Sequence, residues 1–420
     1  MKMNYLRMVG GVLFSLPLLF ASCGNGDNAL EEIINGGGSG GGSSTTENKY
    51  YVWDDTQLKL VATDIPSDAK EITTSTEKLE GGTYIVKGDV TISRAEGLDV
   101  TADSKLILCD GAKLTVNGHI EDESGSNTLK ISIYGQEKQT GQLIINATDS
   151  HGLWAKDIEI HGGDIDVKAV TGGFIPNGIY TYNDLAIYGG TVKATGGDAD
   201  ATYPGGYGIL CGNDYGPIEG NLTIKGDAVV KAYGGAKNTN SGGDAIHVTK
   251  DVEISGNADV YAEAGEDATA AIYCSGTADI TIKGKKLEVN CSGAGSGIET
   301  TDGSVEISAG TISITHENGI AIQSNKAVNI SGCTFTSTGG FGRNIDAGTT
   351  VEFANDVVKI ELINLNLTGD ASAITEYVNA GTSFTCGGSP VNLTGTIGEF
   401  VASSDKVSFD GTTKKLTYQP

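Results

Sequence analysis

One short pattern recurs along the chain from residue 151 to about residue 345. Each copy opens with Gly or Ala and an apolar residue, continues with a short Asp-apolar-x-Ile strand, turns at glycine and ends in a Val-x-Ala strand. The opening positions lie roughly 22 to 37 residues apart, which is typical of stacked repeats. They are Gly152, Gly178, Gly208, Ala245, Ala271, Gly297 and Gly319. Short β-runs broken by glycine, without helical spacing, predict a solenoid in which each repeat is one coil.

The repeat therefore predicts an all-β chain, folded as a single right-handed parallel β-helix over residues 81–400. A solenoid grows by adding coils, so a length of 420 residues does not require several domains. We expect an N-terminal cap segment over residues 47–80 and a C-terminal cap over residues 401–420, because the open ends of a solenoid must be covered.

The first 22 residues have the pattern of an export signal. Lys2 and Arg7 precede an apolar run over residues 8–21 that is too short to span a membrane. Small residues directly before Cys23 predict a bacterial lipoprotein that is cleaved there and lipidated on Cys23, with an ordinary secretory signal as the alternative. Residues 23–46 contain GGGSGGGSS and predict a flexible tether. The expected location is the outer membrane or cell surface of a Gram-negative bacterium, held by the lipid alone.

The formal net charge is −25, and removal of Lys2 and Arg7 with the signal would bring it near −27. A chain this acidic is not expected to bind nucleic acid or anionic lipid through general electrostatics. It is suited to solubility outside the cell and to collecting Ca²⁺.

Six cysteines follow Cys23, an even number that would permit disulfides in an exported chain. Cys211 and Cys274 share one inward position of the repeat, but Val248 fills that position in the coil between them. Two coils span about 9.6 Å, which is too far for a disulfide. We therefore expect buried thiols.

The opening strand of each repeat should alternate between inward and outward side chains. The expected inward column is Ala155, Thr181, Cys211, Val248, Cys274, Thr300 and Ile322. The expected outward column is Trp154, Tyr180, Leu210, His247, Tyr273, Glu299 and Ala321. Rings at Trp154, Tyr180, His247 and Tyr273 would form an apolar strip on which sugar rings could stack. The alternative is that they pack under the loops or on one another as a cross-coil ladder.

The Val-Lys-Ala motif predicts a second outward column of Lys168, Lys193 and Lys231 on the third strand. Neutralisation by nearby carboxylates is one interpretation of this column. The other is a binding subsite for the carboxylate or sulfate groups of an acidic polysaccharide.

Acidic residues gather at the junctions between coils. Calcium takes six to eight oxygen ligands, including the carbonyls of glycine-rich turns. Asp198, Asp200 and Asp244 are therefore the predicted calcium ligands, although aspartates also form turns without any metal.

No catalytic residues are predicted, since the chain lacks the motifs that β-helix hydrolases carry, any zinc spacing and any nucleophile elbow. An enzyme remains an alternative through Lys193 or Lys231, which could act as the base of a polysaccharide lyase near Asp198 and Asp200.

Some segments resemble known bacterial surface proteins. Adhesin-like β-helix proteins have first coils similar to GGTYIVKGDVTIS (81–93), SKLILCDGAKLTVNGHI (104–120), NTLKISIYGQ (127–136) and TGQLIINAT (140–148). The segment GGDAIHVTKDVEISGNADV (242–260) is similar to the repeats of a family of calcium-dependent, polysaccharide-binding surface β-helices. That family has the shape of pectate lyases without their catalytic motifs, and its Gly-Asp-Gly-Ile loops hold calcium. GGDAI at 242–246 keeps the Asp, whereas NGI at 177–179 and SGI at 296–298 lack it.

Together these features predict a non-catalytic, lipid-anchored surface protein that binds a polysaccharide. The alternatives are a lyase acting on an acidic glycan and a structural adhesin that contacts other proteins.

Overall fold

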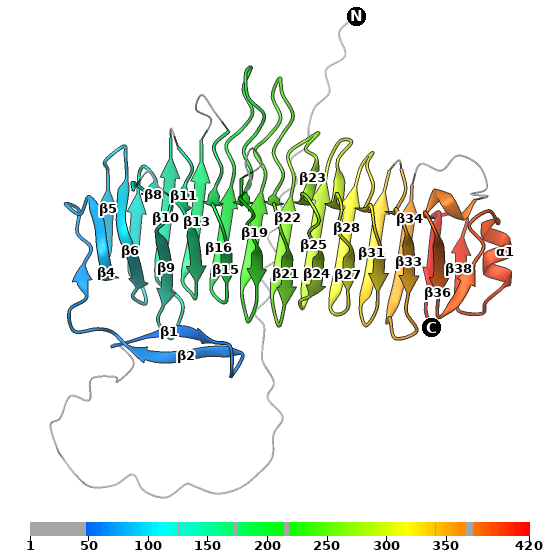
Figure 1. Ribbon diagram of the computed structural model, residues 1–420, viewed down its shortest axis with the longest axis horizontal. Helices are drawn as coiled ribbons and strands as arrows, with labels where there is room; N and C mark the ends of the chain where they lie inside the picture. The colour runs from blue at the N-terminus through cyan, green and yellow to red at the C-terminus, as the bar shows by residue number, and fades with distance from the viewer. Residues whose placement is uncertain are drawn as a thin grey trace, which may run out of the picture. The chain divides into compact units, whose positions relative to one another are not determined.

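The computed structural model describes residues 48–124, 127–148, 150–170, 175–213, 218–340, 342–365 and 373–420. The predicted signal peptide, Cys23 and the tether lie outside these ranges. The described chain is an all-β parallel solenoid of about 10 turns, which confirms the predicted fold class (Figure 1). The helices within these ranges are all too short or too polar to span a lipid bilayer.

Each full coil contributes three strands, which stack on the equivalent strands of the next coil to form three faces. The first face consists of β8 (Ile120–Asp122), β11 (Leu153–Ala155), β14 (Ile179–Thr181), β17 (Ile209–Cys211), β20 (Ile246–Val248), β23 (Ala270–Cys274), β26 (Ser296–Thr300), β29 (Ile322–Ser324), β32 (Ile345–Ala347) and β35 (Val378–Ala380). The second face consists of β3 (Lys70–Glu71), β4 (Lys78–Val86), β6 (Leu98–Leu108), β9 (Lys130–Gly135), β12 (Asp157–Ile160), β15 (Leu185–Ile187), β18 (Leu222–Ile224), β21 (Val252–Ser255), β24 (Ile280–Lys283), β27 (Val305–Ile307), β30 (Val328–Ile330), β33 (Thr350–Phe353), β36 (Ser383–Cys386) and β37 (Ser389–Val391). The third face consists of β5 (Asp89–Ile92), β7 (Lys113–Val116), β10 (Gln142–Ala147), β13 (Asp164–Ala169), β16 (Thr191–Thr195), β19 (Val229–Tyr233), β22 (Asp259–Glu263), β25 (Lys286–Cys291), β28 (Thr311–His316), β31 (Thr334–Gly339), β34 (Lys359–Asn364), β39 (Lys415–Tyr418) and β38 (Val407–Asp410).

The core lies between the three faces because every strand alternates. In β13, for example, Ile165, Val167 and Ala169 are buried while the residues between them are exposed or half-buried. The same inward positions on all three faces form one continuous hydrophobic cluster along the stacked coils. A parallel stack of identical patterns keeps this register, since a shift by one residue would turn every apolar side chain outward.

The inward column of the first face is confirmed from Ala155 to Thr300 and is wrong in the last repeat. Thr300 pairs with Ser324, and Glu299 pairs with Gln323, so Ile322 and Ala321 do not occupy these positions. The last repeat opens at Ala321 and not at Gly319. Ser324 is tolerated in the core because its hydroxyl donates to the Gly303 carbonyl oxygen at 2.7 Å.

The aspartate that begins the second strand of each repeat links neighbouring coils. Asp184 Oδ1 accepts the backbone N–H of Asn221 at 3.0 Å, and Asn221 Oδ1 accepts that of Asp251 at 3.3 Å. Asp251 Oδ1 accepts the N–H of Asp279 at 2.9 Å, and Asp279 Oδ1 that of Ser304 at 2.7 Å. Part of the acidic composition is therefore structural.

Two long loops, residues 196–207 and 234–244, project from the edge between the third and first faces (Figure 1). They lie backbone to backbone: Gly206 N donates to the Gly197 carbonyl at 2.7 Å, and Gly235 N donates to that of Gly206 at 2.8 Å. A Cβ on Gly206 would lie 1.9 Å from the carbonyl oxygen of Pro176. Only glycine permits so close an approach.

The N-terminal cap expected over residues 47–80 stays a prediction, and the structure shows two features of this segment that the sequence did not indicate. The antiparallel hairpin of β1 (Lys49–Asp54) and β2 (Lys59–Asp64) packs against the side of the second face through Tyr50 and Trp53. In addition, β3 and β4 already pair in parallel with the coils, so the solenoid starts near residue 70 and not at residue 81.

At the other end, β39 pairs antiparallel with β34 and with β38. A short helix, α1 (Ile397–Ala402), follows the 3₁₀ turn η1 (Ile374–Glu376) and strands β35 to β37. It starts with a capping box between Thr396 and Glu399, and buries Ile397 and Phe400 in the main core. The capping role assigned to residues 401–420 stays a prediction.

The prediction of buried thiols is confirmed for five cysteines. Cys211, Cys274, Cys291, Cys333 and Cys386 are buried and unbonded, while Cys109 is half-buried and also unbonded. Burial raises the pKa of Cys211 to about 12, so this thiol is held in its protonated, unreactive form.

Candidate functional site

An aromatic cluster, formed by His151, Trp154, Tyr180 and Tyr182, lies on the outside of the first face. Trp154 and Tyr180 occupy the same outward position of β11 and β14, and their rings stack with centroids 5.7 Å apart and planes 16° apart. Tyr182 stacks on Trp154 at 6.0 Å, and the His151 ring meets the edge of Tyr180 at 4.8 Å. Strand register and turn residues thus bring four rings together from two coils.

The cluster is only partly accessible. Tyr180 is 8% exposed, whereas Trp154 and Tyr182 are half-buried and present part of their rings to solvent. Trp154 Nε1 makes no hydrogen bond within the described residues. Burial lowers the pKa of His151 to about 4, so this ring is neutral at pH 7 and its Nδ1 accepts the backbone N–H of Asn177 at 3.0 Å. The cluster therefore presents uncharged aromatic surface.

The outward column continues through Leu210 to a second group of rings. His247 is 5% exposed, stacks on Tyr207 at 4.4 Å and lies 4.7 Å from the ring of Tyr273. The predicted strip of exposed rings is thus corrected: Tyr180 and His247 are covered, because His151 and Tyr207 from the turns fold over them. Sequence reasoning missed His151, Tyr182 and Tyr207, which lie in turns outside the strand periodicity.

Beside His247 lies a buried carboxylate. Asp244 is 2% exposed, and its Oδ2 lies 2.8 Å from His247 Nδ1. Its Oδ1 accepts the backbone N–H of Ala270 at 3.0 Å. Two coils farther along, burial raises the pKa of Glu299 above its usual range.

The three predicted calcium ligands do not share one site. Asp198 Oδ1 accepts the N–H of Ala236, and Asp200 Oδ1 accepts those of Thr202 and Tyr203. Asp244 is occupied as described above. Within the described ranges, no group of three or more His, Cys, Asp or Glu side chains is arranged to hold a metal ion. Calcium binding stays a prediction, without a preformed carboxylate cage to support it.

The predicted lysine column is wrong in register. Lys193 and Lys231 are neighbours, but Lys193 faces Asp166 on the preceding strand, and Lys168 faces Thr195. Lys193 Nζ lies 3.2 Å from Asp166 Oδ2. The Val-Lys-Ala motif of β13 lies two residues further along its strand than the motif of β16. The shared motif in the sequence does not reveal this shift. No three-lysine stripe therefore supports a subsite for an acidic glycan or a lyase base.

A second row of rings lies on the second face and was not predicted. Tyr134 stacks on His161 at 4.6 Å, and His161 stacks on Tyr188 at 5.0 Å. The hairpin covers this row, with Trp53 stacked on Tyr188 at 5.3 Å and Trp53 N donating to His161 Nδ1 at 3.0 Å. The residue that directly follows the Ile of each second strand could have revealed the row.

His161 also explains the most perturbed carboxylate of this face. Its Nδ1 is an acceptor, so the proton is on Nε2, which lies 3.5 Å from Glu159 Oε2. Together with Lys130, whose Nζ lies 2.7 Å from Glu159 Oε1, it lowers the pKa of Glu159 to about 2. These groups stabilise the docked hairpin, and their partners are within the protein.

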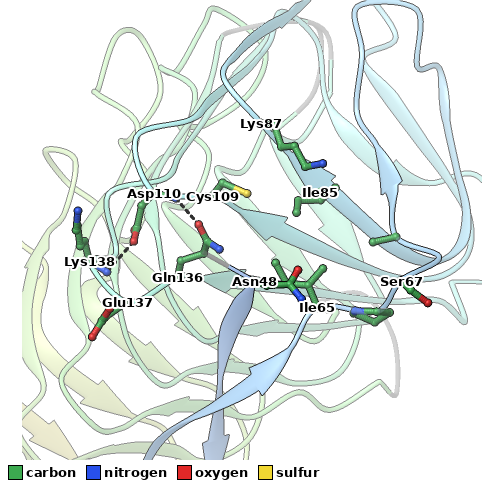
Figure 2. Close-up of a pocket in the computed structure, with 12 residues that line it drawn as sticks. Asn48, Ile65, Ser67, Ile85, Lys87, Cys109, Asp110, Gln136, Glu137 and Lys138 are labelled. Carbon is green, nitrogen blue, oxygen red and sulfur yellow. Dashed lines mark hydrogen bonds between the residues drawn. The ribbon is translucent and has the colours of Figure 1, made fainter. Parts of the chain in front are cut away.

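A hollow of about 890 Å³ lies where the hairpin meets the turns of the first coils (Figure 2). Gln136 bridges its walls: the side-chain Oε1 accepts the N–H of Asp110 at 2.9 Å, and Nε2 donates to the Lys49 carbonyl at 3.0 Å. Asp110 in turn accepts the N–H of Lys138 at 3.0 Å. These polar groups already bond to one another. We therefore interpret the hollow as the structural junction between the hairpin and the first coils.

Comparisons with protein-family models, with curated proteins and with solved structures find no match to this chain.

Proposed function

We propose that this protein is a non-catalytic, glycan-binding adhesion protein of the bacterial surface. The observation that carries this proposal is the aromatic cluster, in which Trp154 and Tyr182 keep part of their rings exposed on a rigid β-solenoid face. Sugar rings present C–H surfaces that pack on such aromatic faces, while their hydroxyls bond to nearby polar groups.

The surface location rests on the amino-terminal sequence alone. The basic start, the short apolar run and the small residues before Cys23 support a lipoprotein signal, and the glycine-serine segment supports a tether. A lipid on Cys23 would anchor the protein without any spanning segment. Mass spectrometry of the protein purified from bacterial membranes tests this step. A diacylated Cys23 supports it, and an unmodified Cys23 contradicts it.

The two tryptophans of the chain allow a direct test of the binding site. Under tryptophan-selective excitation, a Trp53→Phe variant reports on Trp154 alone, and a Trp154→Phe variant reports on Trp53 alone. A glycan that stacks on the aromatic cluster should change the emission of the first variant and leave that of the second unchanged. A glycan array probed with the full chain first identifies the ligand to use.

Affinity provides the second readout. Trp154→Ala and Tyr182→Ala should each weaken glycan binding about tenfold, because a lost stacking contact of about 1.4 kcal/mol corresponds to that factor. If both variants fold and bind with unchanged affinity, the aromatic cluster is not the binding site. A structural adhesin that contacts proteins is then the better interpretation. Repeating the array with Ca²⁺ and with a chelator tests the calcium prediction separately.

A further inference from the structure

A groove of about 470 Å³ lies on the edge between the third and first faces, along β22, β25, β28 and β31. This part of the solenoid is several coils away from the aromatic cluster. The turns that follow β22, β25 and β28 contain only six, four and five residues, much shorter than the two long loops.

One wall of the groove is a row of polar side chains on consecutive coils. Asn290 pairs with Thr315, and Thr315 pairs with Thr338, at a spacing of about 4.8 Å. Thr315 is exposed and Thr338 half-buried, and neither hydroxyl makes a hydrogen bond with the described chain. A hydroxyl both donates and accepts, so this row can bond to a ligand that carries many hydroxyls.

The floor of the groove contains a buried histidine. His316 is 2% exposed at an inward position of β28, and both of its ring nitrogens are covered. The ring packs on Gly339, where a Cβ would lie 2.2 Å from His316 Cε1, so no larger residue fits beside it. Because both ring nitrogens are covered, the ring closes the floor by packing alone, and the polar contacts of a ligand would fall on the threonine row.

The charges in the groove limit what it can bind. Glu263 and Glu317 lie on its rim, and none of the described residues that line it is Lys or Arg. Burial lowers the pKa of His316 to about 4, so this ring adds no positive charge at pH 7. Leu365 is 59% exposed and adds an apolar surface. Carboxylates in the wall repel an anionic ligand.

We propose that this groove is a second glycan subsite, which accepts sugar units bearing hydroxyls and no carboxylate or sulfate. This inference rests on the proposed glycan-binding function and gives its ligand class. It differs from the acidic glycan that was one of the two interpretations of the lysine motif, whose register the structure corrects.

The test compares two pairs of threonines on the same two strands. In the full chain, Thr315→Val with Thr338→Val removes both groove hydroxyls, whereas Thr311→Val with Thr334→Val changes the matched pair at the far end of β28 and β31. Isothermal titration uses three hexasaccharides: cellohexaose, a chitosan hexamer and an oligogalacturonate. We expect the wild-type protein to bind cellohexaose or the chitosan hexamer, and not the oligogalacturonate. The groove double variant should bind at least about tenfold more weakly, and the control should bind like the wild type.

Each other outcome overturns a defined statement. If the groove variant binds like the wild type while Trp154→Ala does not, the subsite is wrong and the proposed function stands. If the wild-type protein binds the oligogalacturonate more tightly than the other two hexasaccharides, the proposed ligand class without carboxylates is wrong. If the wild-type protein binds no hexasaccharide in this set or on the array, the proposed function fails, and the subsite fails with it.

Discussion

At the scale of single residues, hydrogen-bonding side chains decide how the coils are joined. The aspartate of each Asp-apolar-x-Ile strand bonds to the backbone of the next coil, as Asp184, Asp251 and Asp279 do. Such a bond acts like a helix cap, because the side-chain oxygen satisfies a backbone N–H at a turn. The acidic residues of these turns thus link neighbouring coils by hydrogen bonds, and they contribute to the negative net charge of the chain.

This role can be tested at Asp251. Asp251→Ala removes the acceptor of the Asp279 N–H and should destabilise the protein by about 1 kcal/mol. Asp251→Asn keeps an oxygen at the same place and should cost much less. Urea denaturation of both variants gives the comparison. Equal losses in the two would mean that the charge matters, and not the hydrogen bond.

At the scale of elements, the hairpin β1–β2 packs on a row of rings that includes His161. The hairpin rests on the row of Tyr134, His161 and Tyr188, and a Cβ on Gly226 would lie 2.7 Å from the Trp53 ring. The hairpin is attached to the side of the solenoid by aromatic contacts, Tyr50 with Tyr134 and Trp53 with Tyr188. Loss of the Trp53 ring should therefore release the hairpin while the coils persist.

Trp53→Ala should raise the hydrogen-exchange rates of the amides of residues 49–64 and leave those of β25, β28 and β31 unchanged. Trp53 is half-buried, so its truncation should cost less than the roughly 3–5 kcal/mol typical of a fully buried aromatic side chain, but it removes the stacking on Tyr188 that holds the hairpin. Trp53→Phe, which keeps a stacked ring, is the matched control. Faster exchange throughout the solenoid would show that the hairpin is an integral part of the core.

His316 predicts a defined pH dependence of stability. Its folded pKa is about 4, against about 6.5 in the unfolded chain, so the unfolded state binds the proton first as the pH falls. The stability from this group is complete above about pH 6.5 and declines towards pH 4, by up to roughly 3 kcal/mol. A His316→Leu variant should lose less stability across this window than the wild type, as measured by urea denaturation. If the free energy of unfolding falls equally with pH in both proteins, His316 is not the group responsible.

At the scale of the whole molecule, stability comes from repeated packing between coils. Each coil contacts its neighbours, so the free energy of unfolding is approximately a sum of coil and interface terms. Disulfides play no part in the described chain, since its six cysteines are unbonded. Stacked isoleucines, valines and leucines carry the core instead.

A reducing agent should therefore leave the thermal midpoint of the full chain unchanged. In a Cys23→Ser background, a thiol reagent should label Cys109 before the other cysteines, because Cys109 is half-buried and the other five are buried. Adding Cys109→Ala should abolish this fast phase. A large drop in the midpoint under reduction would reveal disulfides and contradict the structure.

By itself, the sequence determined the all-β class, the parallel stacking and most of the inward positions, because side-chain alternation and glycine turns are local properties. The repeat pattern also predicted that Trp154, Tyr180, His247 and Tyr273 lie in one column, and the strand register confirms it.

Only the tertiary structure decided which of these rings are covered and which lysines are neighbours. A shift of two residues in β13 separates Lys168 from Lys193, and turn residues such as Tyr207 bury His247. Both depend on contacts between segments that lie 25 or more residues apart in the chain. Strand periodicity reports which face a residue occupies, whereas exposure depends on what the loops and the hairpin place over that face.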